Sequence, residues 1–534
     1  MSEQKDFDYI IVGGGAAGCV LAARLSASGQ HSVALLERGP RDKRPAIRVA
    51  GVFPRLYSLP ETERVTSEIE PSLGDRRGVV MQGNVLGGGS SIGAMIYMRG
   101  QREDFDGWAS DHGCTGWAYD DLLPIFRRQE KNMRLNNEFH GTEGPVVISD
   151  PNAPHPLSQM AIDATIATGV PPSDDFNGAR QEGAGWYQVN IFKGERQSAA
   201  RCFLHPALSR ENLTLLTDTS ARRIVIENRR AVAIEARDAR GKDIVLRAGR
   251  EIILSAGSFQ SPKLLMLSGI GPAEELTRHG IDVVVDAPEV GANFHDHMST
   301  AVTHLLDGIE GLYRQDRGRN ALRNVKDYIL HRTGPLTSSH LDAGACVDTN
   351  GDGRPDVQLN FAGFAPGNPG TPRIADNAMV ISATVMQTKS RGRVGLRSKN
   401  PEDPPKVLSN ALAEPGDVDT LRRGVRLAQS IYAQAPLKDV LGAPIWPLPG
   451  TDTGQGSEAF DEAIRARAES KEHPTGTCRM GPDPKAVVDL ELRVNGVEGL
   501  RVVDCSVMPA LVSGNTEAPT MVIADRAADM ILRA

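Results

Sequence analysis

Apolar positions near the start of the chain form two short runs on either side of a glycine-rich segment. Residues 8–12 and 33–36 are nearly continuous apolar runs, which is typical of strands buried in a parallel sheet. Between them, the motif Gly13-x-Gly15-x-x-Gly18 leads into a small and apolar stretch that predicts a helix. The pattern therefore predicts a strand, a tight turn, a helix and a second strand in immediate succession.

Such a turn at the N-terminus of a helix is suited to binding a dinucleotide. Gly13 permits the turn, Gly15 lets the backbone approach a pyrophosphate, and Gly18 lets the helix pack closely on the strand. The phosphates then meet unpaired N–H groups and the positive end of the helix dipole. Glu37, which ends the second strand, is expected to accept hydrogen bonds from the adenosine ribose and to disfavour the 2′-phosphate of NADP. The motif alone leaves FAD and NAD open, and a glycine-rich turn in another α/β protein is the less specific alternative.

Later apolar patterns predict a second, different region of the chain. Residues 141–176 are rich in glycine and proline and predict loops around one helix, which is typical of a crossing between domains. Short apolar runs separated by polar turns then predict strands at 213–216, 223–226, 231–234 and 244–246, and residues 251–257 predict another buried strand that ends in small residues. Between about 300 and 465, helical stretches alternate with strands such as 357–361 and 393–396, and we assign this part to a substrate-facing domain.

Length and charge narrow the class of protein. A chain of 534 residues exceeds the roughly 250–300 at which a single core stops growing, so we expect at least two domains. The net charge is only −7, without a long basic run, which makes nucleic acid an improbable partner. No stretch approaches the roughly 20 apolar residues of a membrane span, and the polar N-terminus has no export signal. The expected location is the cytoplasm.

Neither a disulfide framework nor a metal site is expected. The six cysteines are scattered, with no C-x-x-C pair and no histidine at metal-binding spacing. Residues 348–353 open like a calcium loop, but Leu359 occupies the twelfth position, where a bidentate glutamate is needed. A surface turn is therefore the favoured interpretation.

Two further glycine-rich segments exceed what one nucleotide fold needs. Residues 83–95 contain five glycines, and residues 257–271 predict a strand end that turns into a short helix closing on Gly-Ile-Gly. A backbone without side chains can approach a flat ligand, and its N–H groups can bind an anion. Taken alone, residues 83–95 fit an ordinary loop entering a buried helix equally well.

Together these segments resemble the glucose-methanol-choline (GMC) flavoprotein oxidoreductases over nearly the whole chain. Residues 257–271 fit the second signature of that family, and residues 83–95 fit the first except at Gly93, where the family has Asn or His. Residues 473–480, 500–509 and 514–516 resemble its catalytic tail. Residues 96–100 and 174–179 are most similar to the bacterial choline dehydrogenase, sorbose dehydrogenase and hydroxymethylfurfural oxidase branch.

The resemblance implies an α/β fold, in which a Rossmann-like FAD-binding domain is joined to an α+β substrate domain with an antiparallel sheet and helices. The FAD domain is expected to comprise residues 1–153, 207–299 and 467–534, and the substrate domain residues 154–206 and 300–466. The implied FAD-binding residues are Gly13, Gly15, Ala16, Ala17, Gly18, Glu37, Arg38, Gly83, Leu86, Gly88, Gly89, Ser90, Ser91, Gly93, Ala94, Met95, Val225, Ala256, Gly257, Asp504, Cys505, Asn515, Thr516 and Pro519.

The resemblance also implies oxidation of a small alcohol, primary alcohols in the first place, by hydride transfer to flavin N5. His473 matches the catalytic base, and a histidine that titrates near neutrality suits the removal of a hydroxyl proton. Asn515 matches the residue that donates a hydrogen bond to the substrate oxygen, although Gly-Asn-Thr is also an ordinary turn. The electron acceptor, oxygen or a quinone-like compound, is left open.

Three positions depart from the family pattern. Ile92 stands where some members attach FAD through a histidine, so non-covalent FAD is expected. Gly93 removes a hydrogen-bonding side chain near the flavin. Glu472 replaces an aromatic residue before the base; it either faces the cavity, where its charge is expected to raise the pKa of His473 and favour a cationic or polyhydroxyl substrate, or it points into solvent.

Other functions are possible on the same fold. Some relatives are hydroxynitrile lyases that retain the flavin without redox use, and others are light-driven decarboxylases. Because both His473 and Asn515 are present, alcohol oxidation is favoured over these activities and over a non-catalytic protein.

Overall fold

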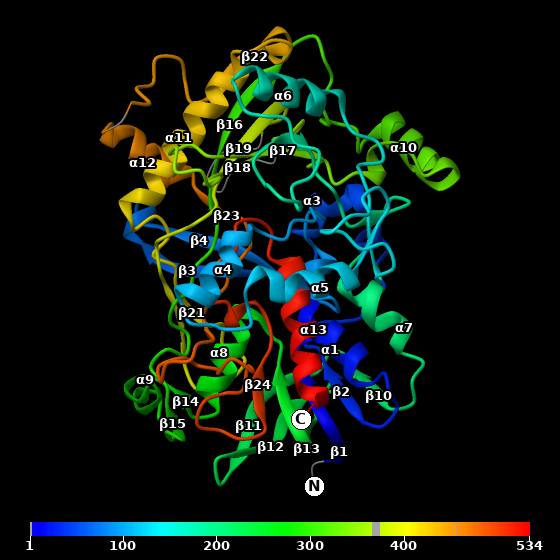
Figure 1. The fold of residues 1–534 in the computed structure, drawn as a ribbon, viewed down its shortest axis with the longest axis vertical. Helices are drawn as coiled ribbons and strands as arrows, with labels where there is room; N and C mark the ends of the chain where they lie inside the picture. The colour runs from blue at the N-terminus through cyan, green and yellow to red at the C-terminus, as the bar shows by residue number, and fades with distance from the viewer. Residues whose placement is uncertain (1–2, 366–373, 455, 534) are drawn as a thin grey trace.

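Two seven-stranded sheets organise the protein, one toward each end of its long axis (Figure 1). The computed structural model describes residues 3–365, 374–454 and 456–533. The first sheet carries the N-terminal glycine motif, and the second lies above it in the view of Figure 1. The expected α/β architecture with two different sheets is confirmed.

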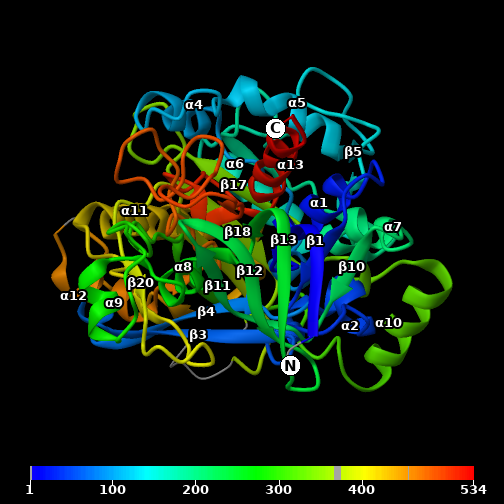
Figure 2. The ribbon, with the colours of Figure 1, turned by 90° about the horizontal axis from the view of Figure 1, so that it is seen from below.

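The first sheet has the order β10-β2-β1-β13-β12-β11, with β24 beside β13. The strands β10, β2, β1, β13 and β24 run parallel, whereas β11 and β12 form an antiparallel extension. Helices α1 and α13 lie together over one face of this sheet (Figure 2). The strands are β1 Glu3–Val12, β2 Val33–Leu36, β10 Leu213–Leu216, β11 Ser220–Glu227, β12 Arg230–Arg237, β13 Asp243–Leu254 and β24 Leu500–Val502, and the helices are α1 Ala16–Leu25 and α13 Glu517–Arg533.

One expectation about this sheet differs from the structure. The predicted strands 244–246 and 251–257 belong to one continuous strand, β13, which ends at Leu254, before the predicted end at residue 257. Residues between them stay paired with β1, where Ala248 lies opposite Phe7 and a register shift follows. Arg247 and Arg250 are exposed, although Leu246 and Ile252 on either side of them are buried in the core. Their polar side chains therefore resembled a turn in the sequence.

The second sheet is antiparallel throughout, with the order β22-β16-β19-β18-β17-β7 and β23 beside β16. Successive side chains along each strand point to opposite faces of this sheet. On one face, Leu359, Phe361 and Ile381 belong to a core that includes residues of α6 and α11. The elements are β7 Gly183–Trp186, β16 Met298–Leu306, β17 Ala343–Val347, β18 Val357–Ala362, β19 Ala378–Val385, β22 Leu441–Trp446, β23 Glu469–Ser470, α6 Pro156–Ala167 and α11 Pro415–Tyr432.

The two sheets are joined by segments at the middle level of the molecule (Figure 1). A two-stranded ribbon of β3 Thr62–Glu70 and β4 Arg76–Gly83 contacts both β21 and β23. The other helices and strands are α2 Pro45–Arg48, α3 Phe53–Leu56, α4 Arg102–Ser110, α5 Tyr119–Gln129, β5 Glu130–Asn132, β6 Val146–Ile148, β8 Ile191–Phe192, β9 Glu195–Arg196, α7 His205–Ala207, α8 Gly257–Leu267, β14 Ile270–Gly271, α9 Ala273–Arg278, β15 Val285–Asp286, α10 Gly318–His331, β20 Arg393–Gly395, β21 Lys406–Leu408 and α12 Glu458–Arg467.

The division of the chain into five domain segments remains a prediction. Strand β7 lies within 154–206, and β17, β18, β19 and β22 lie within 300–466, so these segments build the second sheet. Strand β23 lies beyond the expected boundary at residue 466 but pairs with β16 of the second sheet. This short strand leads directly into the predicted catalytic tail.

The expected surface turn at residues 348–353 is confirmed. The Asp348 carboxylate accepts backbone N–H groups of Gly351 at 2.6 Å and Gly353 at 2.8 Å, and Leu359 is buried in β18.

All six cysteines are free thiols. Within the described ranges, no three metal-ligating side chains gather at one point, and no helix has the length and apolar character needed to cross a membrane.

Candidate active site

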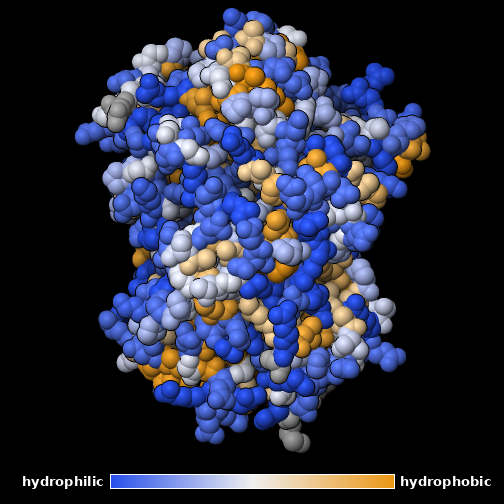
Figure 3. Space-filling model, viewed as in Figure 1, coloured by the Kyte–Doolittle hydropathy of each residue, from blue (hydrophilic) through white to orange (hydrophobic). Residues whose placement is uncertain are grey.

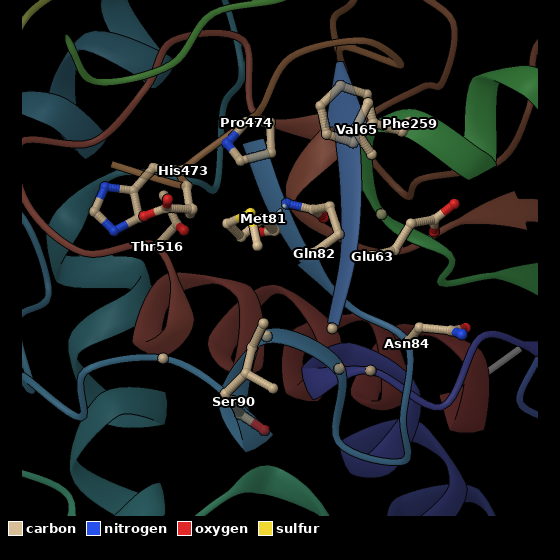
Figure 4. Close-up of a pocket in the computed structure, with 18 of the residues that line it drawn as sticks. Glu63, Val65, Met81, Gln82, Asn84, Ser90, Phe259, His473, Pro474 and Thr516 are labelled. Atoms are coloured by element: carbon tan, nitrogen blue, oxygen red, sulfur yellow. Dashed lines mark hydrogen bonds between the residues drawn. The ribbon is translucent and has the colours of Figure 1, made fainter. Parts of the chain in front are cut away.

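The three glycine-rich segments line one cavity of about 860 Å³. His473 and Thr516 lie at one end of the residues drawn in Figure 4, and Glu63 and Asn84 lie at the other. The predicted site residues that line this cavity are Gly13, Gly15, Ala16, Ala17, Glu37, Arg38, Gly83, Gly88, Gly89, Ser90, Gly93, Ala94, Met95, Ala256, Gly257, His473, Asp504, Cys505, Asn515 and Thr516. Segments far apart in the sequence therefore meet around a single space.

The first two glycine segments are in direct backbone contact. The N–H of Gly87 donates to the carbonyl of Gly14 at 2.7 Å. A Cβ atom on Gly88 would lie 2.9 Å from the Cα of Gly15, so a side chain there would push the two segments apart. A Cβ on Gly18 would lie 1.9 Å from the Gly13 carbonyl oxygen. Gly18 thus serves the close packing of α1 on the turn and does not itself line the cavity.

Glu37 ends β2 with its carboxylate buried against backbone. Its Oε2 accepts the N–H of Gly14 at 2.8 Å and its Oε1 accepts the N–H of Gly39 at 2.7 Å. Burial raises the pKa of this carboxyl group, and the two hydrogen bonds oppose that rise. Because each carboxylate oxygen has two acceptor sites, Glu37 retains capacity for a ligand hydroxyl at the cavity.

The third glycine segment is tied to the C-terminal tail by Asp504, which follows β24. One carboxylate oxygen of Asp504 accepts the N–H of Gly257 at 2.9 Å and the hydroxyl of Ser261 at 2.6 Å. The backbone of Gly257 adopts φ +81°, which favours glycine. Next to it, Ser258 Oγ donates to the Pro474 carbonyl at 2.7 Å. The start of α8 is thereby connected to the loop that holds His473.

Four other predicted FAD-binding residues lie outside the lining. Leu86 and Ser91 are buried within the second glycine segment, where Ser91 Oγ donates to the Leu86 carbonyl at 2.7 Å. Val225 lies farther along β11, which reaches the cavity through residues 219–221 instead. Pro519 is in the first turn of α13 and is buried behind the residues of that turn that line the cavity.

His473 is held by a chain of hydrogen bonds that fixes its tautomer. Its Nδ1 lies 2.8 Å from His297 Nδ1, and His297 Nε2 lies 3.0 Å from the Met386 carbonyl oxygen. A carbonyl only accepts, so His297 Nε2 carries the hydrogen and, in a neutral ring, His297 Nδ1 is an acceptor. Burial lowers the pKa of His297 to about 4, which keeps this ring neutral. His473 therefore donates from Nδ1 and presents a lone pair at Nε2.

Asn515 lies beside that lone pair. Its Nδ2 is 3.4 Å from His473 Nε2, in keeping with an amide N–H directed at an acceptor. Its Oδ1 is buried without a hydrogen-bond partner among the described residues. The backbone N–H of His473 donates to Asp296 Oδ1 at 2.9 Å, which positions the base from the other side. A proton acceptor and a hydrogen-bond donor thus meet at one end of the cavity.

The expected effect of Glu472 on His473 is wrong. Burial above all, with a smaller contribution from the ammonium group of Lys471, holds the pKa of His473 well below its usual range. Glu472 does line the cavity, with a positive backbone φ of 60°, so it is not a solvated surface acid. However, burial raises the pKa of Glu472 to about 8, so near neutral pH it is mostly uncharged and cannot favour an imidazolium.

The sequence interpretation missed several residues of the site. His297 and Asp296 belong to the triplet His295-Asp296-His297, whose clustered titratable groups were a usable signal. Arg196 of β9 is buried and donates to the carbonyl of Gly93 at 2.6 Å, bracing the second glycine segment. Neither Arg196 nor Lys471 belongs to a motif that indicated such a position.

Comparisons with known proteins agree with this site. Models of the GMC oxidoreductase family match residues 7–299 and 388–524. The chain is 39% identical to the oxygen-dependent choline dehydrogenase of Brucella suis biovar 1, covering 98% of this chain and 95% of that protein. It is 37% identical to an alcohol dehydrogenase [acceptor] of Pseudomonas putida, covering 99% and 96% of the two chains. The crystal structure of pyridoxine 4-oxidase from Mesorbium loti has a TM-score of 0.90 at 29% identity, with 99% of each chain covered.

These matches confirm the expected resemblance and give no support to a lyase. The family models cover both ends of the chain, and the relatives are similar to it over nearly their full lengths. The cavity unites the glycine segments and the tail on which the resemblance was based. The chain belongs to the GMC oxidoreductase family and is an FAD-dependent oxidoreductase of alcohols.

Proposed function

We propose that this protein oxidises a small, primary alcohol to the aldehyde, with His473 as the base and Asn515 as the hydrogen-bond donor to the substrate oxygen. The observation that carries the proposal is the lone pair of His473 Nε2, presented beside the Asn515 amide at one end of a glycine-lined cavity. FAD, when bound, supplies the acceptor for the hydrogen and two electrons that leave the carbinol carbon. Oxygen or a quinone-like compound is the proposed final acceptor, and a cytoplasmic location remains a prediction.

The cavity suits FAD because its walls combine bare backbone with a buried acid. A Cβ atom on Gly89 or Gly257 would meet nothing within 4 Å, so these two glycines face open space where a flat group can approach. We propose that the first glycine segment binds the pyrophosphate and that Glu37 binds the ribose. Ile92 lines the same cavity with a hydrocarbon side chain that forms no covalent bond to a flavin. Non-covalent binding is therefore part of the proposal.

His473 and Asn515 would act in sequence on the substrate hydroxyl. His473 Nε2 accepts the hydroxyl proton while its Nδ1–H remains bound to His297, which keeps the ring oriented. As negative charge develops on the oxygen, the Asn515 amide stabilises it by donating a hydrogen bond. Asp296 holds the backbone of the base in place. The contacts that orient the base, with His297 and Asp296, are already formed in the protein.

The first prediction concerns FAD attachment. Because Ile92 replaces the histidine of the covalent attachment site, acid precipitation of the yellow holoprotein is expected to leave all flavin in the supernatant. Absorbance of the supernatant and pellet measures the partition. Flavin retained in the washed pellet would contradict the non-covalent proposal.

The second prediction concerns the base and its partner. His473→Ala is expected to lower the rate of anaerobic flavin reduction by roughly 10²–10⁴-fold, because that is the usual contribution of general base catalysis. Asn515→Ala is expected to lower it by a smaller factor. His279→Ala, after α9 and away from the cavity, is the matched control and should reduce flavin at the rate of the unchanged protein. Each variant should retain FAD. If His473→Ala stays yellow and its flavin is reduced at the rate of the unchanged protein, another group takes the proton.

The third prediction concerns pH. The base works deprotonated, and its pKa lies well below 6.5, so the acidic limb of kcat/KM should lie well below pH 6.5. Glu472, which faces Asp296, Glu469 and Lys471, should ionise near pH 8 and change substrate KM there. Glu472→Gln is expected to abolish the transition near pH 8 and leave the acidic limb in place. If the acidic limb moves in Glu472→Gln, then Glu472 does change the pKa of His473, contrary to this expectation.

A further inference from the structure

The second sheet presents a polar face to the end of the cavity that contains His473. On three neighbouring strands, Asn360 pairs with Ser382 and Ser382 pairs with Ala301, and all three line the cavity. The Asn360 Oδ1 is buried and has no hydrogen-bond partner in the described part of the chain. This face therefore has small side chains and unused hydrogen-bonding capacity, where a polar part of a ligand can lie.

Lys471 brings an ammonium group to this face. Its Nζ donates to Ser382 Oγ at 3.0 Å, and its backbone N–H donates to the His297 carbonyl at 2.9 Å. The side chain lines the cavity only two positions before His473 in the sequence. No carboxylate of residues 3–365, 374–454 or 456–533 lies within 4.0 Å of its Nζ as an ion-pair partner.

Two acids line the cavity near Lys471, and neither forms an ion pair with it. Glu469 and Glu472 line the same cavity, but burial raises the pKa of both carboxyl groups, that of Glu472 to about 8. The Lys471 ammonium group is thus without an ion-pair partner among the described residues and is available to a ligand at this end of the cavity. An anionic group is attracted to it, whereas a quaternary ammonium group would be repelled and could not accept its hydrogen bonds.

We propose that the natural substrate is an alcohol with a carboxylate at its other end, which Lys471 Nζ and Ser382 Oγ bind while its hydroxyl meets His473 and Asn515. The proposal rests on the proposed function, because it assigns the substrate class of the same site. It makes Lys471 a specificity-determining residue, and it distinguishes this chain from relatives named for choline, whose alcohol is cationic.

The test compares two series of alcohols of equal chain length, ω-hydroxyalkanoates and the matching α,ω-diols, with choline as the cationic probe. The expected result is a kcat/KM for the best hydroxyalkanoate roughly 10- to 100-fold above that of its diol, the range typical of charge-assisted hydrogen bonds. Lys471→Met should lower kcat/KM for the hydroxyalkanoate, chiefly through KM, far more than it lowers kcat/KM for the matching diol. Lys471→Glu should reverse it in favour of choline. Lys485→Met, on the exposed surface, is the matched control.

The outcomes separate the two levels of the proposal. If no alcohol in the panel reduces the flavin, the proposed function and the substrate class both fail. If the diols are oxidised but the hydroxyalkanoates are not preferred, or Lys471→Met keeps the preference, the substrate class alone is wrong. Retention of FAD by each variant, measured by absorbance, shows that the variants are folded.

A second, independent feature is the exposed face of α10. Ten large hydrophobic side chains of the described chain are exposed, and four of them lie on this one helix: Leu322, Val325, Ile329 and Leu330. Leu322 is 74% exposed and Ile329 65%. Figure 3 shows hydrophobic surface at the right-hand edge of the molecule, where α10 projects in the view of Figure 1. A gathering of this kind on a single helix is typical of a contact surface.

The same face is basic. Arg319, Arg323 and Lys326 are exposed beside the apolar stripe, and none of them forms an ion pair with a described residue. The opposite side of the helix is anchored, since Asn324 is buried and Tyr328 donates from its hydroxyl to the Gly194 carbonyl at 3.3 Å. The apolar and basic side chains are therefore held outward.

We infer that α10 docks on a lipid bilayer with anionic headgroups, with its apolar stripe in the interface and its basic side chains at the phosphates. Apolar and cationic side chains on one helical face are the combination that binds such surfaces. The helix lies beside the segment that lines the cavity, because Arg55 of α3 forms an ion pair with Asp316 just before α10. Docking would thus hold the cavity wall near the bilayer.

Co-sedimentation of the holoprotein with vesicles tests this inference. We expect binding to vesicles that contain phosphatidylglycerol and little binding to phosphatidylcholine alone. The double variant Leu322→Ser/Ile329→Ser should bind at least roughly 10-fold more weakly, because each substitution removes an aliphatic group that the bilayer would bury. Leu448→Ser, which changes an equally exposed leucine at 61% on another part of the surface, is the matched control. Absence of vesicle binding overturns the inference, as does a dimer in solution that the double variant dissociates, since the face would then contact a second copy.

Discussion

The close approach of backbone segments without side chains is the constraint on which this structure depends. Gly18 packs against the Gly13 carbonyl and Gly88 against Gly15, at distances that no Cβ atom allows. Parallel strands end at the same edge of the first sheet, so they deliver these turns to one place. The cavity, the position of Asp504 and the start of α8 all follow from that meeting of loops.

The sequence predicted local features well because their physical causes are local. Strand β2 has the predicted bounds, and His473 and Asn515 were identified from short motifs and lie together. Long-range partners were not predictable in the same way. His297 meets His473 across 176 positions of sequence, a contact that only the packing of β16 against β23 creates. Residues in β13 were misjudged because exposed polar side chains in a strand resemble those of a turn.

The error at Glu472 has a general physical cause. A carboxylate next to an imidazole raises the imidazole pKa only if the carboxylate remains charged, and burial opposes the charge on both groups. Here the cavity is shielded enough that the acid becomes neutral and the histidine does as well. A sequence shows which groups are neighbours but not how far water is excluded from them, and exclusion of water decides the sign of the effect.

The loop of the base is attached to both halves of the molecule. Upstream, β23 pairs with the second sheet, and downstream the Pro474 carbonyl accepts the hydroxyl of Ser258 on α8, which belongs to the first. A hinge motion that separated the two sheets would break this loop away from Asn515. The geometry of proton removal consequently depends on the spacing of the two sheets, although neither sheet supplies the base itself.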